Sequence, residues 1–251
     1  RRLSDIELLN QYREEAKELW PALPKHTQAM RDWIANVNQL VERKDEHLAY
    51  LKDFCTDKGR RTPEGECVFL SHVDTWEYQT FQSLEEDIRK LGEVGLEGMK
   101  SRLQFAESVE RRTIDELRER WRQTREAISA NPQYGGLLLS PQIGLVPIGA
   151  DPKTGLHEFA HLQSGTVPVR NSDGTLKLRA ETGIVLVLLP GGSFTMGARP
   201  PSSERPLGSP NGDPETKKSE GPPNTVKLAP FFMGKYELTQ GQWQRFMKEN
   251  P

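Results

Sequence analysis

The sequence predicts an α+β chain, in which a long α-helical hairpin or coiled-coil-like connector precedes β-hairpins and the opening strands of a further domain. Apolar residues recur at helical spacing through most of residues 1–130. Short apolar runs separated by Pro and Gly follow in residues 131–181, and β-branched runs alternate with turns in residues 182–251. We therefore divide the chain into a helical connector (1–130), a β-hairpin linker region (131–181) and the start of a domain (182–251).

The composition favours long solvated helices over one large compact core. Hydrophobic residues make up 35% of the chain and charged residues 28%, and the mean hydropathy is −0.69. The formal net charge of −2 gives no general attraction to nucleic acid or to an anionic membrane. The sequence also contains no apolar run long enough to span a membrane.

The connector begins with two predicted helices. Ser4 and Glu7 have the spacing of a capping box, and the helix that they open continues to Pro21. From Thr27 onward, apolar residues alternate steps of four and three, which predicts a heptad seam. Lys44 is the polar position of that seam, whose members are Met30, Ile34, Val37, Val41, Lys44, Leu48, Leu51 and Cys55.

Glycines and charges shape the rest of the connector. Gly92, Gly95 and Gly98 each disfavour helix by about 1 kcal/mol relative to Ala, which predicts a break or a kink. A last long helix is predicted over residues 99–130. Its Glu- and Arg-rich faces are either a docking surface or a solvated surface, and the spacing favours the solvated surface.

The two cysteines of the chain, Cys55 and Cys67, flank a turn-rich loop between helical segments. A disulfide there would join the two helices. Two unpaired thiols fit the sequence equally well, because two cysteines alone do not reveal the redox compartment.

Residues 157–161 read His-Glu-Phe-Ala-His, which has the spacing of a zinc-protease motif. In such enzymes a helix brings both imidazoles to one face. Here Gly155 and Gly165 leave little room for a helix, and no histidine follows His161. A strand is expected instead, and it separates residues four apart by about 13 Å. Glu158 and the two histidines are therefore expected to hold no metal.

The segments "VLVLLPGGSFTMG" and "SEGPPNTVKLAPFFMGKYELTQGQWQRF" together resemble the start of the formylglycine-generating enzyme family, also called sulfatase-modifying factor domains. The resemblance covers roughly residues 182–251. The residues that carry it are Pro190, Gly191, Gly192, Phe194, Met196, Gly197, Glu220, Pro223, Val226, Leu228, Phe231, Lys235, Tyr236, Glu237, Thr239, Gln242, Trp243 and Phe246.

The resemblance implies a fold related to C-type lectins, truncated here after its first part. Active members oxidise a cysteine of a protein substrate to formylglycine with O2 and a copper-binding cysteine pair, and they also bind calcium. Those residues lie later in the domain, so the resemblance places no catalytic, cofactor-binding or metal-binding residue in this chain. Copper and calcium are expected only in an intact domain. Relatives without the cysteines serve other enzymes or bind ligands.

The segment "LSPQIGLVPIGADPKTGLHEFAHLQSG" resembles a region that precedes this domain in bacterial multidomain proteins, many of which carry a Ser/Thr protein kinase. The chain begins without Met and closes within a predicted helix, so we expect a piece of a longer protein. Its expected partners are a protein or peptide bound by the intact domain and other domains of the same protein. The expected compartment is extracytoplasmic if a transmembrane segment precedes the chain, and cytoplasmic otherwise.

Two functions follow from this resemblance. The intact domain either oxidises a protein cysteine or acts as a noncatalytic binding or signalling module. The matched residues also carry structural expectations. Gly191 and Gly192 are expected to form a turn with positive φ. Glu237 is expected to be either a buried hydrogen-bonding carboxylate or a substrate contact, and the buried carboxylate is favoured. Core positions are expected for Phe194, Met196, Tyr236, Trp243 and Phe246.

Overall fold

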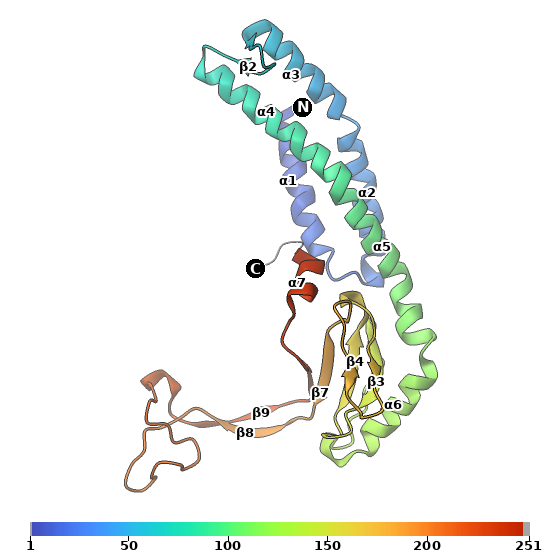
Figure 1. The fold of residues 1–251 in the computed structure, drawn as a ribbon, viewed down its shortest axis with the longest axis vertical. Helices are drawn as coiled ribbons and strands as arrows, with labels where there is room; N and C mark the ends of the chain where they lie inside the picture. The colour runs from blue at the N-terminus through green and yellow to red at the C-terminus, as the bar shows by residue number, and fades with distance from the viewer. Residues whose placement is uncertain (1, 248–251) are drawn as a thin grey trace. The chain divides into compact units, whose positions relative to one another are not determined.

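The computed structural model describes residues 2–247 and combines α-helices with antiparallel sheets (Figure 1). The chain forms two compact units that divide between Arg112 and Thr113. This boundary differs from the division that we made at residue 130 from composition. Residues 118–130 belong to the second unit because Trp121 and Ile128 pack into its core. None of the helices within residues 2–247 has the length and apolar character that crossing a membrane requires.

The first unit is a bundle of helices. Helix α2 packs on α5, and α3 packs on α4. The helical elements are α1 (Arg2–Glu18), η1 (Pro24–His26), α2 (Thr27–Val41), α3 (Lys44–Lys58), α4 (His72–Lys90), η2 (Leu91–Gly95) and α5 (Leu96–Glu110).

The seam of the bundle differs from the predicted heptad. We predicted that Ile34, Val41 and Leu48 would be buried in the seam. Instead Trp33 and Leu40 are buried, and Leu48 is 43% exposed. The chain is not one continuous helix here, because α2 ends at Val41 and α3 begins at Lys44. Several helices share this core, so the buried stripe is wider than a two-helix seam. Met30, Val37, Leu51 and Cys55 of the predicted seam are buried as expected, but one continuous seam along a single helix is not formed.

The three glycines do not break the helix. Residues 91–95 form a π-helical turn between α4 and α5, and the chain remains helical through it. A Cβ at Gly92 would lie 3.1 Å from Cγ1 of Val41. The Cβ of an alanine at Gly95 would lie 2.7 Å from Cδ1 of Leu91. Gly92 and Gly95 thus allow close packing against this turn. Of the predicted break or kink, the break is not formed, but the regular α-helix is interrupted at these glycines by the π-helical turn.

A disulfide joins Cys55 and Cys67, which settles the alternative that the sequence left open. The bridge connects the end of α3 with β2 (Cys67–Val68), which pairs with β1 (Arg60–Arg61). Ser71 then caps α4, since its Oγ accepts a hydrogen bond from the Asp74 backbone N–H at 3.3 Å.

The second unit contains a four-stranded antiparallel sheet in the order β10-β7-β4-β3. The predicted helix over residues 99–130 is in fact two helices, α5 and α6 (Arg118–Ala130), separated by the π-helical η3 (Arg111–Asp115) and a turn. Strand β7 pairs with β4 on one side and β10 on the other, so one sheet unites the regions on both sides of residue 181. The strands are β3 (Leu145–Ala150), β4 (His157–His161), β7 (Val185–Leu189) and β10 (Phe231–Gly234).

Aromatic contacts form the core of this unit. Trp121 of α6 stacks on Phe159 of β4 with ring centroids 5.6 Å apart, and Phe159 meets Phe232 of β10 edge-on at 5.2 Å. Tyr134 supplies hydrogen bonds at one end of the sheet. Its hydroxyl donates to the Leu188 carbonyl at 2.9 Å and accepts from the His157 backbone N–H at 2.9 Å.

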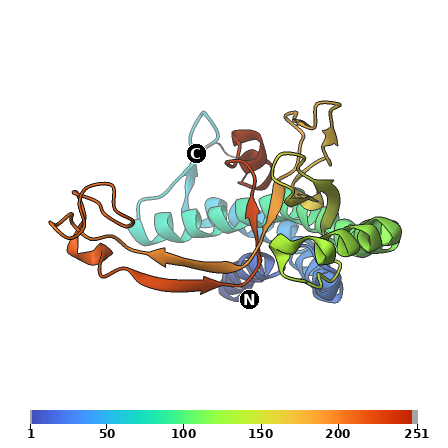
Figure 2. The same cartoon turned by 90° about the horizontal axis from the view of Figure 1, so that it is seen from below.

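The remaining strands form two separate ribbons. The predicted hairpin at Asp173–Gly174 is present as β5 (Val169–Arg170) and β6 (Leu176–Lys177). Strands β8 (Gly192–Met196) and β9 (Asn224–Leu228) lie side by side in a long ribbon (Figure 2). The described chain ends with α7 (Gln240–Met247). The short 3-10 turns of the second unit are η4 (Pro132–Tyr134), η5 (Leu162–Ser164) and η6 (Lys218–Glu220).

The predicted turn with positive φ at Gly191 and Gly192 is not formed, because Pro190 and Gly191 link β7 to β8 and Gly192 already lies in β8. Neither residue has a positive φ. A Cβ at Gly191 would instead lie 2.7 Å from the Leu228 carbonyl oxygen. Glycine is therefore required here by the close approach of β9, and its conformational freedom is not used.

Candidate functional site

A buried cluster of charged side chains lies beside β4. The carboxylate of Glu158 is 1% exposed and accepts a hydrogen bond from Arg170 at 2.7 Å. Lys235 contacts the other oxygen of the same carboxylate and also pairs with Asp151 at 2.6 Å. Two acids and two bases thus balance each other, which compensates the desolvation of Glu158.

The cluster shifts the pKa values of Asp151 and Lys235. The Lys235 ammonium, together with the backbone N–H groups of Lys153 and Thr154, holds the pKa of Asp151 well below its usual range. Burial opposes protonation of Lys235, but its hydrogen bonds to Asp151 and Glu158 outweigh that effect and raise its pKa. Asp151 and Lys235 therefore stay ionised at neutral pH and are not poised to exchange protons.

The His-Glu-Phe-Ala-His motif forms β4, as we expected from the flanking glycines. Glu158 is occupied by two cations, which leaves it no role as a base beside a metal. His157 and Phe159 point to the side of α6, whereas Glu158 points to the opposite face of the strand. The geometry of a zinc-protease helix is therefore not formed. Within residues 2–247, no group of three or more His, Cys, Asp or Glu side chains comes together as a metal site.

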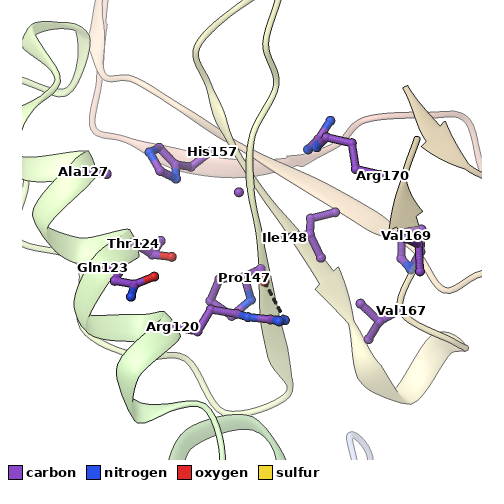
Figure 3. Close-up of a pocket in the computed structure, with 12 residues that line it drawn as sticks. Arg120, Gln123, Thr124, Ala127, Pro147, Ile148, His157, Val167, Val169 and Arg170 are labelled. Atoms are coloured by element: carbon purple, nitrogen blue, oxygen red, sulfur yellow. Dashed lines mark hydrogen bonds between the residues drawn. The ribbon is translucent and has the colours of Figure 1, made fainter. Parts of the chain in front are cut away.

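A groove of about 680 Å³ lies between α6 and the edge strand β3 (Figure 3). Helix α6 contributes Arg120, which extends across Pro147 and donates to its carbonyl at 3.4 Å. Strand β4 contributes His157, and the chain before and within β5 forms the far wall. The lining residues are Arg120, Gln123, Thr124, Ala127, Pro147, Ile148, Gly149, His157, Val167, Pro168, Val169 and Arg170.

The imidazole of His157 is incompletely satisfied. Its side chain lines the groove, and the residue is only 6% exposed. Its Nδ1 atom has no hydrogen-bond partner among the residues that the structure describes. Burial lowers the pKa of His157, so its imidazole is neutral at pH 7. A buried polar atom without a partner destabilises the folded state and marks the groove as a place where a ligand could supply one.

The two cysteines do not fit a copper site. Copper binding of the kind that the family resemblance implies requires a pair of thiolates. Cys55 and Cys67 are bonded to each other, and both lie in the helical unit, outside the segment that resembles the family. No reaction step through copper can therefore be assigned to the residues of this chain.

Several side chains expected in a core lie at the surface. Phe194 and Met196 of β8 are 47% and 61% exposed, and Tyr236 is 44% exposed. Glu237 is also exposed, so the expectation of a buried carboxylate there was wrong. Trp243 and Phe246 are half-buried. Within residues 2–247, Phe194, Met196 and Tyr236 are thus exposed where we expected a core.

Unit 2 is thus a small antiparallel-sheet domain whose motif glutamate lies in a charge-neutral cluster. Residues 174–251 match the family model of the sulfatase-modifying factor enzyme 1-like domain. This segment is therefore similar to a domain of this kind, and the match begins at Gly174, upstream of residue 182, from which we traced the resemblance. Neither a curated protein nor a solved structure matches the chain.

Sequence reasoning missed the cluster and the groove. Lys235 was noticed only as part of a family pattern, and its partners lie 77 and 84 positions upstream in sequence. Arg170 lies in a predicted hairpin, and the sequence alone suggested no function for it. The one usable signal for the cluster was Glu158, an acidic residue within a predicted buried strand. A buried carboxylate needs a cationic partner, so a nearby Lys or Arg could have been expected.

Proposed function

We propose that this chain is a noncatalytic binding or scaffold part of a bacterial multidomain protein. In this proposal the helical unit is a connector, and unit 2 contains the opening part of a sulfatase-modifying-factor-like domain with a fold related to C-type lectins. An adjoining Ser/Thr protein kinase would make the assembly a signalling protein. The kinase and the bacterial source rest on the resemblance of the upstream segment to such proteins.

The observation that carries the proposal is the row of exposed apolar side chains on β8, β9 and β10. The disulfide bears on this chain alone, because the resemblance places the cysteine pair of active members later in the domain. The sequence contains just two cysteines, and they form one bridge in the helical unit. Oxidation of a substrate cysteine by the chemistry of the family would need a thiolate pair within the domain that matches it. The matched segment, residues 174–251, contains no cysteine.

The exposed apolar side chains support a role in assembly. Leu228, Phe231 and Met233 are exposed along β9 and β10, as are Phe194 and Met196 on β8. Contiguous exposed apolar residues are typical of surfaces that another part of a protein covers. We propose that later residues of the same domain, beyond Pro251, cover them in the parent protein.

The proposal is tested by an oxidation assay. The purified chain is incubated with copper, O2 and a sulfatase-type peptide, and mass spectrometry follows conversion of the peptide cysteine to the aldehyde. We expect no turnover. The double variant Cys55→Ser/Cys67→Ser is the matched control. Copper-dependent turnover that disappears in this variant would overturn the proposal.

The second candidate is cysteine oxidation by the intact domain, and the family match itself favours it. A longer form of the protein that contains the whole domain is compared in the same assay. Turnover by the longer form alone would support the oxidase and would refute the noncatalytic role. Absence of turnover in both forms, with the longer form folded, supports the binding role.

A further inference from the structure

We propose that the groove between α6 and β3 binds a small organic monocarboxylate with an apolar body. In this site Arg120 takes the carboxylate, and the imidazole of His157 meets a second polar group of the ligand. The apolar body lies against Ile148 and Val169. This site is independent of the matched family segment, because its lining residues all lie within residues 120–170 and the match begins at Gly174.

The charge of the groove selects an anion. Among the described residues that line it there are two arginines and no carboxylate. Arg170 is already balanced, because it donates to Glu158 at 2.7 Å and to the Gly174 carbonyl at 2.8 Å. Arg120 lies outside that neutral cluster, and its bond to Pro147 is long at 3.4 Å. A guanidinium offers five N–H donors and matches a carboxylate in two-point geometry, so one negative charge suits this site.

The rest of the lining selects an apolar body. Ile148, Val167, Pro168 and Val169 supply branched or cyclic apolar surface beside Arg120 (Figure 3). The volume of about 680 Å³ falls in the range of small-molecule sites, which combine apolar walls with a few polar groups. The unpartnered Nδ1 of His157 is the buried polar atom of this wall.

The edge of β3 argues against an added peptide strand as the occupant. Pro147 has no N–H to donate, and the register of β3 against β4 shifts between Pro147 and Gly149. Proline and bulges are devices that prevent strand addition at a sheet edge. The Pro147 carbonyl is also contacted by Arg120. A compact ligand therefore fits the groove better than an extended chain.

The test is an NMR titration of the full chain with a panel of monocarboxylates, including 4-phenylbutyrate, 3-methylbutyrate and indole-3-acetate. Each acid is paired with its neutral amide. We expect at least one acid to shift the amides of Ile148 and Val169 and the ring nitrogens of His157, and its amide to bind at least about tenfold more weakly.

Arg120→Gln is the diagnostic variant, because Arg120 is exposed and its loss should leave the fold intact. We expect it to weaken binding at least about tenfold. Arg125→Gln, an exposed change on the same helix outside the groove, is the matched control and should leave binding unchanged. The proposal would be overturned if the acids and their amides bound equally well, or if Arg120→Gln bound as tightly as the unchanged protein. It would also be overturned if the shifts lay elsewhere in the chain, or if no acid bound below about 10 mM.

Discussion

Strands β7 and β8 follow each other closely within the same matched segment, yet their surroundings are opposite. Val185 and Leu188 of β7 are buried, whereas every residue of β8 is exposed. Strand β7 has β4 and β10 as neighbours in the sheet, but β8 pairs only with β9 among the described strands. The difference shows that residues within the matched segment are buried only where another part of the protein packs against them. For β7, residues upstream of the match pack against it.

The largest contrast is expected between two phenylalanines. Phe159→Ala removes a fully buried ring between Trp121 and Phe232, so the free energy of unfolding of unit 2 should fall by about 3–5 kcal/mol. Phe194→Ala on the ribbon should change it by less than about 0.5 kcal/mol. Urea unfolding followed by NMR signals of β4 measures both. Similar losses for the two variants would mean that the ribbon is packed in solution.

The next contrast concerns two lysines. Lys235→Met leaves Glu158 with Arg170 as its remaining cation and removes the cationic partner of Asp151, so the free energy of unfolding should fall by about 2 kcal/mol. Lys227→Met on the exposed strand β9 is the control and should have almost no effect. The same urea titration applies. An unchanged midpoint for Lys235→Met would show that the cluster does not stabilise the sheet.

A smaller contrast concerns two tyrosine hydroxyls. Tyr134→Phe removes the hydrogen bonds of its hydroxyl to the Leu188 carbonyl and the His157 N–H, so about 1–2 kcal/mol of the free energy of unfolding should be lost. Tyr236→Phe removes a hydroxyl from an exposed ring and should be neutral. Thermal unfolding of the two variants side by side distinguishes them. Equal melting temperatures would contradict the role of Tyr134 at the end of the sheet.

The smallest expected effect is the change with pH in the free energy of unfolding of the second unit. Burial lowers the pKa of His157 and of His161, so the unfolded state binds protons more readily than the folded state. Stability is therefore complete above the unfolded pKa near 6.5 and falls as the pH falls. Between pH 7 and 6 we expect a loss below about 1 kcal/mol. A matched His157→Gln/His161→Gln variant should show a flatter profile, and the same profile in both proteins would refute the assignment.

The sequence was sufficient for the features that depend on local pattern. Helices in the first half, the strand over His157–His161, the hairpin at Asp173–Gly174 and the family resemblance were all visible in residue spacing. Features that depend on distant residues were not visible. The partners of Lys235 lie far upstream, and the turn at Gly92 and Gly95 is set by packing that spacing alone does not reveal. The exposure of Phe194 likewise depends on the absence of covering chain within residues 2–247.

The central claim is that the chain upstream of residue 181 and the matched segment fold as one sheet. Hydrogen exchange of the whole chain, resolved by residue, tests it most directly. The account predicts that interior amides of β4, β7 and β10 exchange slowly and with similar protection, whereas amides of β8 and β9 exchange much faster. Fast exchange of β7 together with β8, while β3 and β4 remain protected, would contradict it.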